Sequence, residues 1–268
     1  MDKQRFKFGK NWKQFLTTLN EERIHKAEDS LKTYLNLKTL KNKKFLDVGC
    51  GSGLFSLAAK KLEAEVYSFD YDQQSVECTK FLKNKFFAKD QSWIIEQGSV
   101  LDPEYLEKFK DVDIVYSWGV LHHTGDMKQA FKNILSLPKV GGFLFISIYN
   151  DQGPISTFWK WLKKTYVSSG KLTQLFLTSY VFLVCWGPII IKDTLKSFNP
   201  LKTWKAYSKN RGMSAWHDIV DWAGGYPFEV GKPEEIFDFF KTNNYELQKM
   251  TTRGGKLGCN EFLFKRMN

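Results

Sequence analysis

Three glycines at alternate positions stand where a strand pattern gives way to a helix pattern. Gly49, Gly51 and Gly53 belong to the segment LDVGCGSG, which follows a run typical of a buried strand and precedes a helical stretch at 54–62. Glycine lets the backbone approach a ligand closely, and the following helix offers unpaired N–H groups at its N-terminus. The spacing differs from the dinucleotide fingerprint, and no Lys-Ser/Thr pair follows as a phosphate loop requires. The loop therefore predicts a ligand that is not held by a nucleotide phosphate.

An acidic residue closes the next strand pattern. Asp70 ends the segment EVYSFD, about 20 residues after Gly49, where a carboxylate can accept both hydroxyls of a ribose. Taken alone, Asp70 also suits a strand-end turn, and Asp47 suits a buried carboxylate with its hydrogen bonds satisfied. Because strand, glycine loop, helix, second strand and acid occur together in register, we expect a nucleoside site at this edge.

Two groups of histidines are candidate bases. His122 and His123 follow the fourth strand pattern, and side chains at the carboxyl ends of parallel strands face the ligand crevice. His217 is followed by Asp218, which could orient it, as could Asp221. An imidazole with a pKa near neutrality can take a proton from a hydroxyl acceptor. The alternative for His122 and His123 is a structural role.

An aromatic and acidic segment supplies candidates for acceptor binding. Residues 211–229 combine indole and phenol rings with carboxylates and an imidazole, which suits a ring-shaped or glycosidic acceptor better than a phosphate backbone. The alternative is a structural cap with the tryptophans in a core. Tyr149, a further catalytic candidate, follows the fifth strand pattern and points to the same edge. The acceptor-binding candidates are His122, Asn150, Arg211, Trp216, Asp221, Trp222 and Tyr226.

Strand and helix patterns alternate through most of the chain. This rhythm predicts an α/β fold with a parallel sheet wound by helices. After an interruption the pattern resumes with a helix at 233–243 and strands at 245–250 and 260–266. The connection between these strands is too short for a helical crossover, so we expect them to pair antiparallel. The expected parts are an N-terminal helical segment at 1–44, a core at 45–151 and 232–268, and a helical insertion at 152–231.

The formal net charge of +11 is concentrated in two parts of the chain. Residues 1–44 hold 12 basic and 5 acidic side chains, and residues 152–211 hold 10 and 1. Such clustering indicates either a polyanion-binding surface or a lysine-rich solvated one. The four cysteines are too few and too scattered for a disulfide framework, and no apolar stretch follows the N-terminal charges as in a secretory signal. We therefore expect a reduced, cytoplasmic protein.

An uncharged run between Lys171 and Lys192 is long enough to cross a bilayer. A single crossing would separate two halves of one sheet, so the run predicts one of two other structures. One is a buried lid or dimer helix, and the other is an interfacial helix that gives the protein peripheral contact with a membrane. Monomer and homodimer both stay open. Arg253 and residues 258–261 flank the final hairpin, where turn formation explains the glycines better than a role in the pocket.

The motifs LDVGCGSG, SFDYD, GSVLD and DIVYSWGVLHHTGD resemble those of class I S-adenosylmethionine-dependent methyltransferases, in the branch of ubiquinone/menaquinone-type small-molecule methylases. The resemblance covers residues 45–149 and 233–268. It implies a doubly wound, Rossmann-like sheet of seven strands in the order 3-2-1-4-5-7-6, with the last strand antiparallel. It also implies S-adenosyl-L-methionine as cofactor and S-adenosyl-L-homocysteine as product.

The resemblance assigns donor contacts residue by residue. Asp47 and residues 49–53 would hold the methionine part, Asp70 the ribose, and Tyr71 a face of the adenine. Ser99 and Val100 would reach the adenine edge, although many relatives have Asp where Ser99 stands. Independently of the resemblance, residues 117–124 follow the fourth strand, so Ser117 and Trp118 are expected to face the donor.

The leading hypothesis is O-methylation of a small or lipid-linked hydroxylated acceptor by in-line displacement. The second is an RNA methyltransferase that uses the basic insertion as its electrostatic footprint, and the third is a donor-binding scaffold without turnover. The chain has Ser117-Trp118-Gly119-Val120 where amine methylases of bases have Asn/Asp-Pro-Pro-aromatic. No cysteine in this loop could act as a covalent nucleophile, and no His/Asp pair has metal-ligand spacing.

Overall fold

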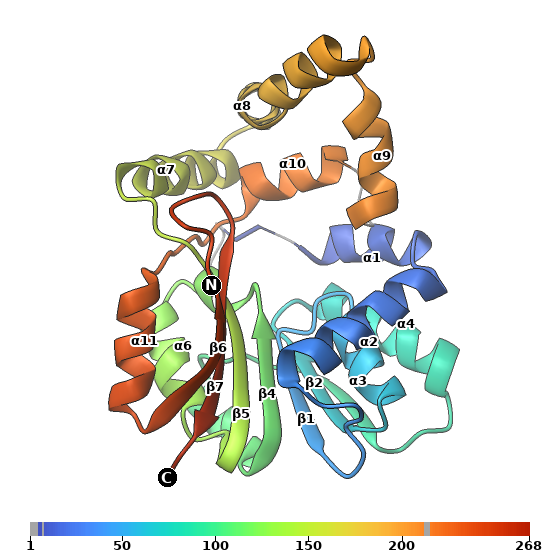
Figure 1. Cartoon of the computed structure of the whole chain (residues 1–268), viewed down its shortest axis with the longest axis vertical. Helices are drawn as coiled ribbons and strands as arrows, with labels where there is room; N and C mark the ends of the chain where they lie inside the picture. The colour runs from blue at the N-terminus through green and yellow to red at the C-terminus, as the bar shows by residue number, and fades with distance from the viewer. Residues whose placement is uncertain (1–4, 7, 212–214) are drawn as a thin grey trace.

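The computed structural model describes residues 5–6, 8–211 and 215–268, apart from the side chains of Lys10, Gln14, residues 208–211 and His217. Its centre is a seven-stranded sheet in the order β3-β2-β1-β4-β5-β7-β6 (Figure 1). The first five strands run parallel, and β7 is antiparallel to both of its neighbours. The predicted strand order and the antiparallel final pair are confirmed. The strands are β1 (Lys44–Val48), β2 (Glu65–Asp70), β3 (Trp93–Gln97), β4 (Val112–Trp118), β5 (Pro138–Tyr149), β6 (Tyr245–Thr251) and β7 (Cys259–Arg266).

Helices cover both faces of the sheet, and each face has its own apolar core. The central strands β1 and β4 are buried along most of their length, which is why their sequences are mostly apolar. One face carries α2 (Glu21–Leu35), α3 (Leu54–Lys61) and α4 (Gln73–Phe87), with α1 (Gly9–Thr17) packed on α4. The other face carries α5 (Pro103–Leu106), α6 (Met127–Ile134) and α11 (Pro233–Thr242).

Helix boundaries follow local capping chemistry. Asn20 caps α2, because its side chain accepts a hydrogen bond from the Arg23 N–H. Helix α6 ends at Ile134, four residues before Pro138. Pro138 disfavours helical backbone at the residue before it, and β5 already begins at Pro138, which pairs with Val112.

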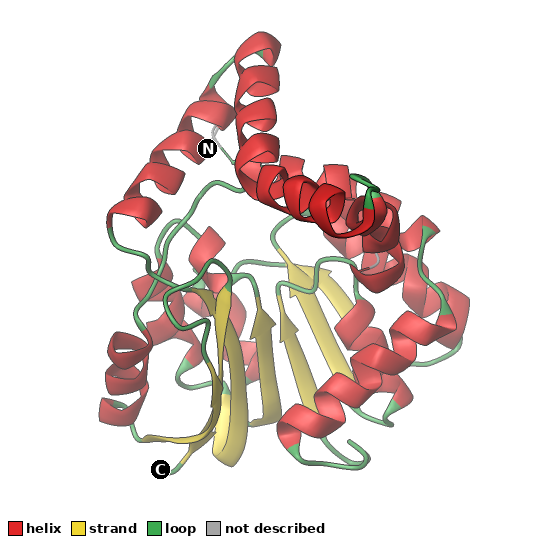
Figure 2. Ribbon diagram, turned by 45° about the horizontal axis from the view of Figure 1, so that its top comes forward, coloured by secondary structure: helices red, strands yellow, loops and turns green. Residues whose placement is uncertain are grey.

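The insertion forms four helices that lie across the carboxyl ends of the parallel strands (Figure 2). A separate apolar cluster, with Trp159, Val181 and Ile219 among its members, holds these helices together. Tyr149, at the end of β5, packs against this cluster from the core side. The acceptor side of the strand ends is thus roofed by a unit with its own core. The four helices are α7 (Pro154–Ser168), α8 (Lys171–Ser197), α9 (Lys202–Arg211) and α10 (Ala215–Gly224).

Gly53 directly precedes α3 and has a left-handed backbone with φ +80°. A Cβ at this position would lie 2.8 Å from the Thr79 Cα of α4. We expect Gly53→Ala to lower the free energy of unfolding by about 2–4 kcal/mol, since it combines backbone strain with a clash against a neighbouring backbone. Gly141→Ala is the matched control, because Gly141 has a φ of +77° and nothing lies within 4 Å of its added Cβ. The control should lose about 1 kcal/mol. Urea unfolding measures the free energy of unfolding of both variants, provided that the m-values are unchanged. Equal losses of stability in the two variants would contradict a packing role for Gly53.

Candidate active site

A cavity of about 1030 Å³ lies between the strand carboxyl ends and the insertion. Its floor is formed by the glycine loop after β1, the end of β2 and the loop after β3. Its roof is formed by residues of α8, α9 and α10, and its sides by the N-terminal segment and the turn between β6 and β7. The parallel strands therefore deliver donor and acceptor candidates to one cavity, as expected for an open α/β sheet.

Asp70 occupies the centre of the floor. Its two carboxylate oxygens accept hydrogen bonds from the N–H groups of Gly51, at 2.9 Å, and Asp72, at 2.8 Å. Burial raises the pKa of Asp70 to about 6, and these two hydrogen bonds oppose that rise. The carboxylate retains lone pairs that can accept the hydroxyls of a ribose.

The neighbouring floor positions agree with a flat aromatic group beside the ribose site. Tyr71 is 57% exposed, lines the cavity and carries the Arg5 guanidinium 4.5 Å from its ring centre. Ser99 and Val100 line the cavity after β3. The Ser99 hydroxyl accepts the Leu101 N–H at 3.1 Å, so it also shapes its own loop. Gly49 and Trp118 complete this side, and the Trp118 indole donates to Glu261 on β7.

Three residues that are expected to contact the donor are absent from the part of the cavity wall that the structure describes. Asp47 is enclosed, burial raises the pKa of its carboxyl to about 7, and it accepts a hydrogen bond from Ser56. Gly53 packs against α4, and the hydroxyl of Ser117 donates to the Val48 carbonyl on β1 at 3.1 Å. These residues support the donor loop from behind it.

His123 lines the cavity as a neutral imidazole. Its Nδ1 lies 2.6 Å from the Pro227 carbonyl oxygen, and because a carbonyl only accepts, Nδ1 carries the proton and Nε2 carries the lone pair. Burial lowers the pKa of His123 to about 3. Such an imidazole stays neutral at physiological pH and is a weak proton acceptor.

His122 is fully buried and does not line the described cavity. Its Nδ1 accepts the Tyr149 N–H at 3.3 Å, and its ring lies 4.0 Å from the Tyr149 ring. The His122 ring thus packs against Tyr149, and its expected acceptor contact stays a prediction. Tyr149 does line the cavity, and burial raises the pKa of its phenol far above the ordinary value, so it stays protonated.

Two carboxylates from one face of α10 reach the cavity roof. Asp218 and Asp221 are three residues apart and both line the cavity. The Tyr207 hydroxyl donates to Asp218, and the Asn11 amide donates to Asp221. Burial and the nearby Asp218 charge raise the pKa of Asp221 to about 7.

The remaining acceptor candidates divide into three groups. Trp222 lines the roof as expected. Asn150, Trp216 and Tyr226 are absent from the part of the cavity wall that the structure describes. The Asn150 side chain donates a hydrogen bond to the Lys256 carbonyl and accepts one from Asn260, which fixes the β6–β7 turn. Trp216 points to solvent with 44% exposure. The side chains of His217 and Arg211 lie outside the described residues, and both assignments stay predictions.

Sequence analysis missed the N-terminal contribution to the site. Phe6, Phe8 and Trp12 line the cavity, and Trp12 would lie 3.1 Å from a Cβ at Gly51. The alternation of aromatic and basic residues in RFKFGKNW was the available signal. Arg253, Gly258 and Cys259 also line the wall, so the hairpin turn takes part in the pocket. Within the described residues, no group of three or more His, Cys, Asp or Glu side chains could hold a metal ion.

Comparison with known proteins identifies the family. A family model described as a methyltransferase domain matches residues 39–203. The chain therefore belongs to this family and is a class I S-adenosylmethionine-dependent methyltransferase. The residues on the cavity floor fit the donor, because Asp70 presents a carboxylate and Gly49 and Gly51 line the cavity without side chains. Asp70, Tyr71, Gly49, Gly51, Ser99 and Val100 would hold it.

The relatives differ in what they methylate. Ubiquinone biosynthesis O-methyltransferase of Pelagibacter ubique is 28% identical over 213 residues, which is 80% of this chain and 65% of that protein. A ribosomal protein L11 methyltransferase of Legionella pneumophila is 46% identical over 124 residues, which is 46% of this chain and 40% of that protein. The chain thus spans less than two thirds of the length of either relative. Magnesium protoporphyrin IX methyltransferase from Synechocystis, solved with S-adenosylhomocysteine, shares the fold with a TM-score of 0.51 and 14% identity, over 91% of this chain and 82% of that one.

We expect Asp70→Ala to weaken binding of S-adenosylhomocysteine at least thirtyfold. The substitution removes charge-assisted hydrogen bonds to ribose of about 2 kcal/mol or more. Titration calorimetry at pH 8, where Asp70 is ionised, measures the dissociation constant, and thermal unfolding checks that the variant is folded. Asp29→Asn, on the exposed side of α2, is the control and should bind normally. An unchanged dissociation constant for Asp70→Ala would contradict the ribose assignment.

Proposed function

We propose that the protein transfers a methyl group to a hydroxyl of a small or lipid-linked acceptor. The observation that carries this proposal is the single cavity that joins the donor floor to a roof of aromatic rings and carboxylates. Trp186, Tyr207 and Trp222 provide flat apolar surface, and Asp218 and Asp221 provide hydrogen-bond acceptors. Such a pocket suits a compact acceptor with an apolar or ring-shaped body and polar substituents.

The bound donor supplies a methyl group on a sulfonium, which joins a lone pair of the acceptor oxygen while the C–S electron pair leaves with S-adenosylhomocysteine. The protein must hold the acceptor in line and take the hydroxyl proton. We assign the proton to the Asp221 carboxylate. A base with a pKa near 7 is half ionised at neutral pH and binds a proton far more strongly than His123 does.

The surroundings of Asp221 suit this role. Lys163 is fully buried in α7, donates to the Trp222 carbonyl and lies 3.9 Å from the Trp222 ring centre. Burial lowers the pKa of Lys163 to about 7, and the charged form of Lys163 lowers the pKa of Asp221, opposing the rise caused by burial and Asp218. Neutral His123 can then accept a hydrogen bond from the acceptor through Nε2, without competing for the proton.

The roof argues against a nucleic-acid acceptor. Asp218 and Asp221 would repel a phosphate backbone at the point where the acceptor must enter. The exposed lysines of the insertion do not line the described cavity. Because one relative is named for ribosomal protein L11, the experiment below also includes a protein fraction.

Incubation with labelled S-adenosylmethionine and separate lipid, metabolite, RNA and protein fractions tests the proposed acceptor class. We expect label in the lipid or metabolite fraction, held by an ether linkage that survives mild base. Label in RNA or protein alone would contradict the proposal. Absence of transfer to all fractions, with donor binding retained, would favour a scaffold.

On the labelled acceptor, we expect Asp221→Asn to lower kcat about a hundredfold or more and to leave S-adenosylhomocysteine affinity unchanged. The wild-type rate should fall as the pH drops below about 7, because Asp221 becomes protonated, and this acidic limb should vanish in the variant. Asp29→Asn is again the control. If the acidic limb of the pH–rate profile disappears in His123→Gln but persists in Asp221→Asn, the base is His123 and not Asp221.

A further inference from the structure

Helix α8 exposes an apolar stripe along its whole length. Side chains spaced three or four residues apart face solvent, including Leu172 at 86%, Phe176 at 71%, Leu183 at 64% and Leu195 at 76% exposure. The opposite side is also apolar, with Val181 and Trp186 buried against the insertion. By length and composition α8 could cross a membrane. A soluble surface helix normally has a polar outer face, so this stripe needs an explanation.

Helix α7 extends the same surface. Ile155, Phe158 and Trp161 are exposed on one side of α7, and the Phe158 ring lies 6.0 Å from the Tyr180 ring of α8. We call the exposed apolar side chains of α7 and α8 the outer face. More than half of the exposed large apolar side chains among the described residues lie between residues 155 and 201.

The charges around the outer face are of one sign. Lys160, Lys164, Lys171, Lys192 and Lys196 are exposed on α7 and α8. The single acidic residue of 152–211, Asp193, is 8% exposed and accepts two hydrogen bonds from Thr203. An apolar stripe edged by lysines that far outnumber the acidic residues is complementary to a surface of acyl chains and anionic headgroups.

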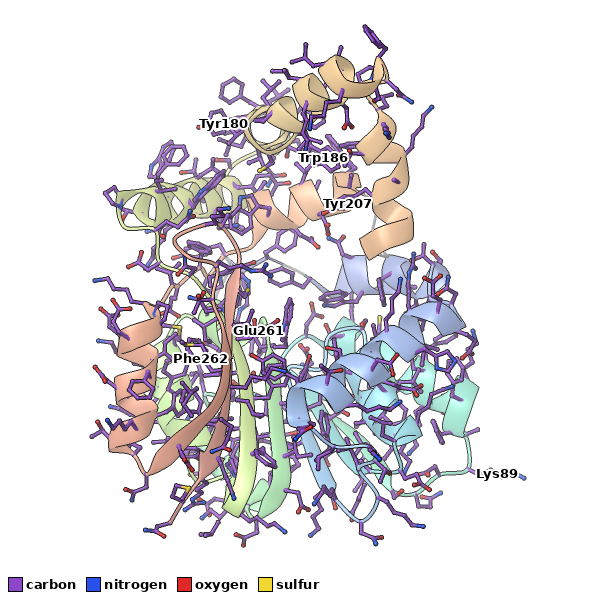
Figure 3. All side chains as sticks on the ribbon, in the orientation of Figure 1. Lys89, Tyr180, Trp186, Tyr207, Glu261 and Phe262 are labelled. Carbon is purple, nitrogen blue, oxygen red and sulfur yellow. The ribbon has the colours of Figure 1, made fainter. Side chains whose placement is uncertain are left out.

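Helix α8 packs along the other insertion helices. Trp186 contacts Trp204 and Tyr207 of α9 at 4.6 and 5.1 Å between ring centres, so the inner side of α8 is held against the insertion (Figure 3). Both ends of α8 lead into helices that pack on the same insertion core. The outer face is at the end of the molecule remote from the C-terminus (Figure 1).

We propose that the outer face docks on an anionic lipid surface, with α8 lying flat in the interface and its lysines at the headgroups. A second copy of the chain is the competing occupant. A symmetric dimer would bring two lysine-edged faces together, whereas anionic headgroups attract them. The proposal holds the protein peripherally on a membrane.

The inner side of the same helix lines the cavity through Val181, Cys185 and Trp186. Docking would therefore place the cavity roof against the lipid surface, where an acceptor with an apolar tail could enter beside α8. This consequence rests on the proposed function, but the docking itself does not.

Vesicle flotation tests the docking without any methyl acceptor. Vesicles of equal parts phosphatidylglycerol and phosphatidylcholine are compared with pure phosphatidylcholine vesicles. We expect the wild type to float about tenfold more with the anionic vesicles at low salt and to detach partly in high salt. Phe176→Glu/Leu183→Glu should lose this binding about tenfold. Phe81→Glu/Val140→Glu, which adds the same charges at residues 53% and 60% exposed on the core, should retain most of it.

Two further measurements separate the outcomes. S-adenosylhomocysteine affinity should be equal in all variants, which shows that the core is folded, and Lys171→Glu/Lys192→Glu should abolish the preference for anionic vesicles. No flotation of the wild type, or equal flotation of all variants, would overturn the proposal. Light scattering gives the oligomeric state. If the wild type is a dimer that does not bind vesicles, and Phe176→Glu/Leu183→Glu is a monomer, the outer face binds a second copy of the chain. If the wild type binds vesicles but transfers no methyl group to the lipid or metabolite fraction, only the proposed function is overturned.

Discussion

The Asp70 carboxylate at the end of β2 is the constraint on which the donor side depends. A buried carboxylate is costly unless it is hydrogen-bonded, and the backbone N–H groups of Gly51 and Asp72 satisfy it. The first bond ties the glycine loop to β2, and the second fixes the start of α4, which Asp72 caps. Asp72 also accepts the Gly9 N–H at 3.0 Å, which places α1 and its Trp12 over the loop.

The acceptor side is organised differently. The donor floor consists of strand ends and tight loops, whereas the roof belongs to helices with their own apolar cluster. Lys163 joins α7 to α10 through the Trp222 carbonyl, inside that cluster. A roof with its own core can change shape or surface while the floor stays constant. A shared fold does not determine the acceptor, and the relatives are named for ubiquinone biosynthesis and for ribosomal protein L11.

The fold could be predicted from the sequence because its signals are local and periodic. Strand runs, the glycine loop and the short hairpin determine the strand order when combined with the family resemblance. Asp70 and His123 were expected from strand ends, which parallel sheets bring to one edge, and both line the cavity, as does Tyr71, which the resemblance implied. Asp47, Ser117 and His122 are not on the described cavity wall, because a position near a strand end does not show which way the side chain points. Asp221 was expected at the acceptor and lines the cavity, but its fitness as a base depends on burial and on Asp218 and Lys163, which only the tertiary structure brings together.

The donor is held on the floor of the cavity, between the glycine loop, the ends of β2 and β3 and the N-terminal segment. Hydrogen exchange followed by mass spectrometry, with and without saturating S-adenosylhomocysteine, tests this placement most directly. The account predicts slower exchange in peptides covering residues 48–53, 70–75 and 98–101, and also in the N-terminal peptide covering Phe8 and Trp12. Peptides from α11, outside the cavity wall, should be unchanged. Protection confined to α11 or to the sheet edge at β3, with the glycine loop unaffected, would contradict the account.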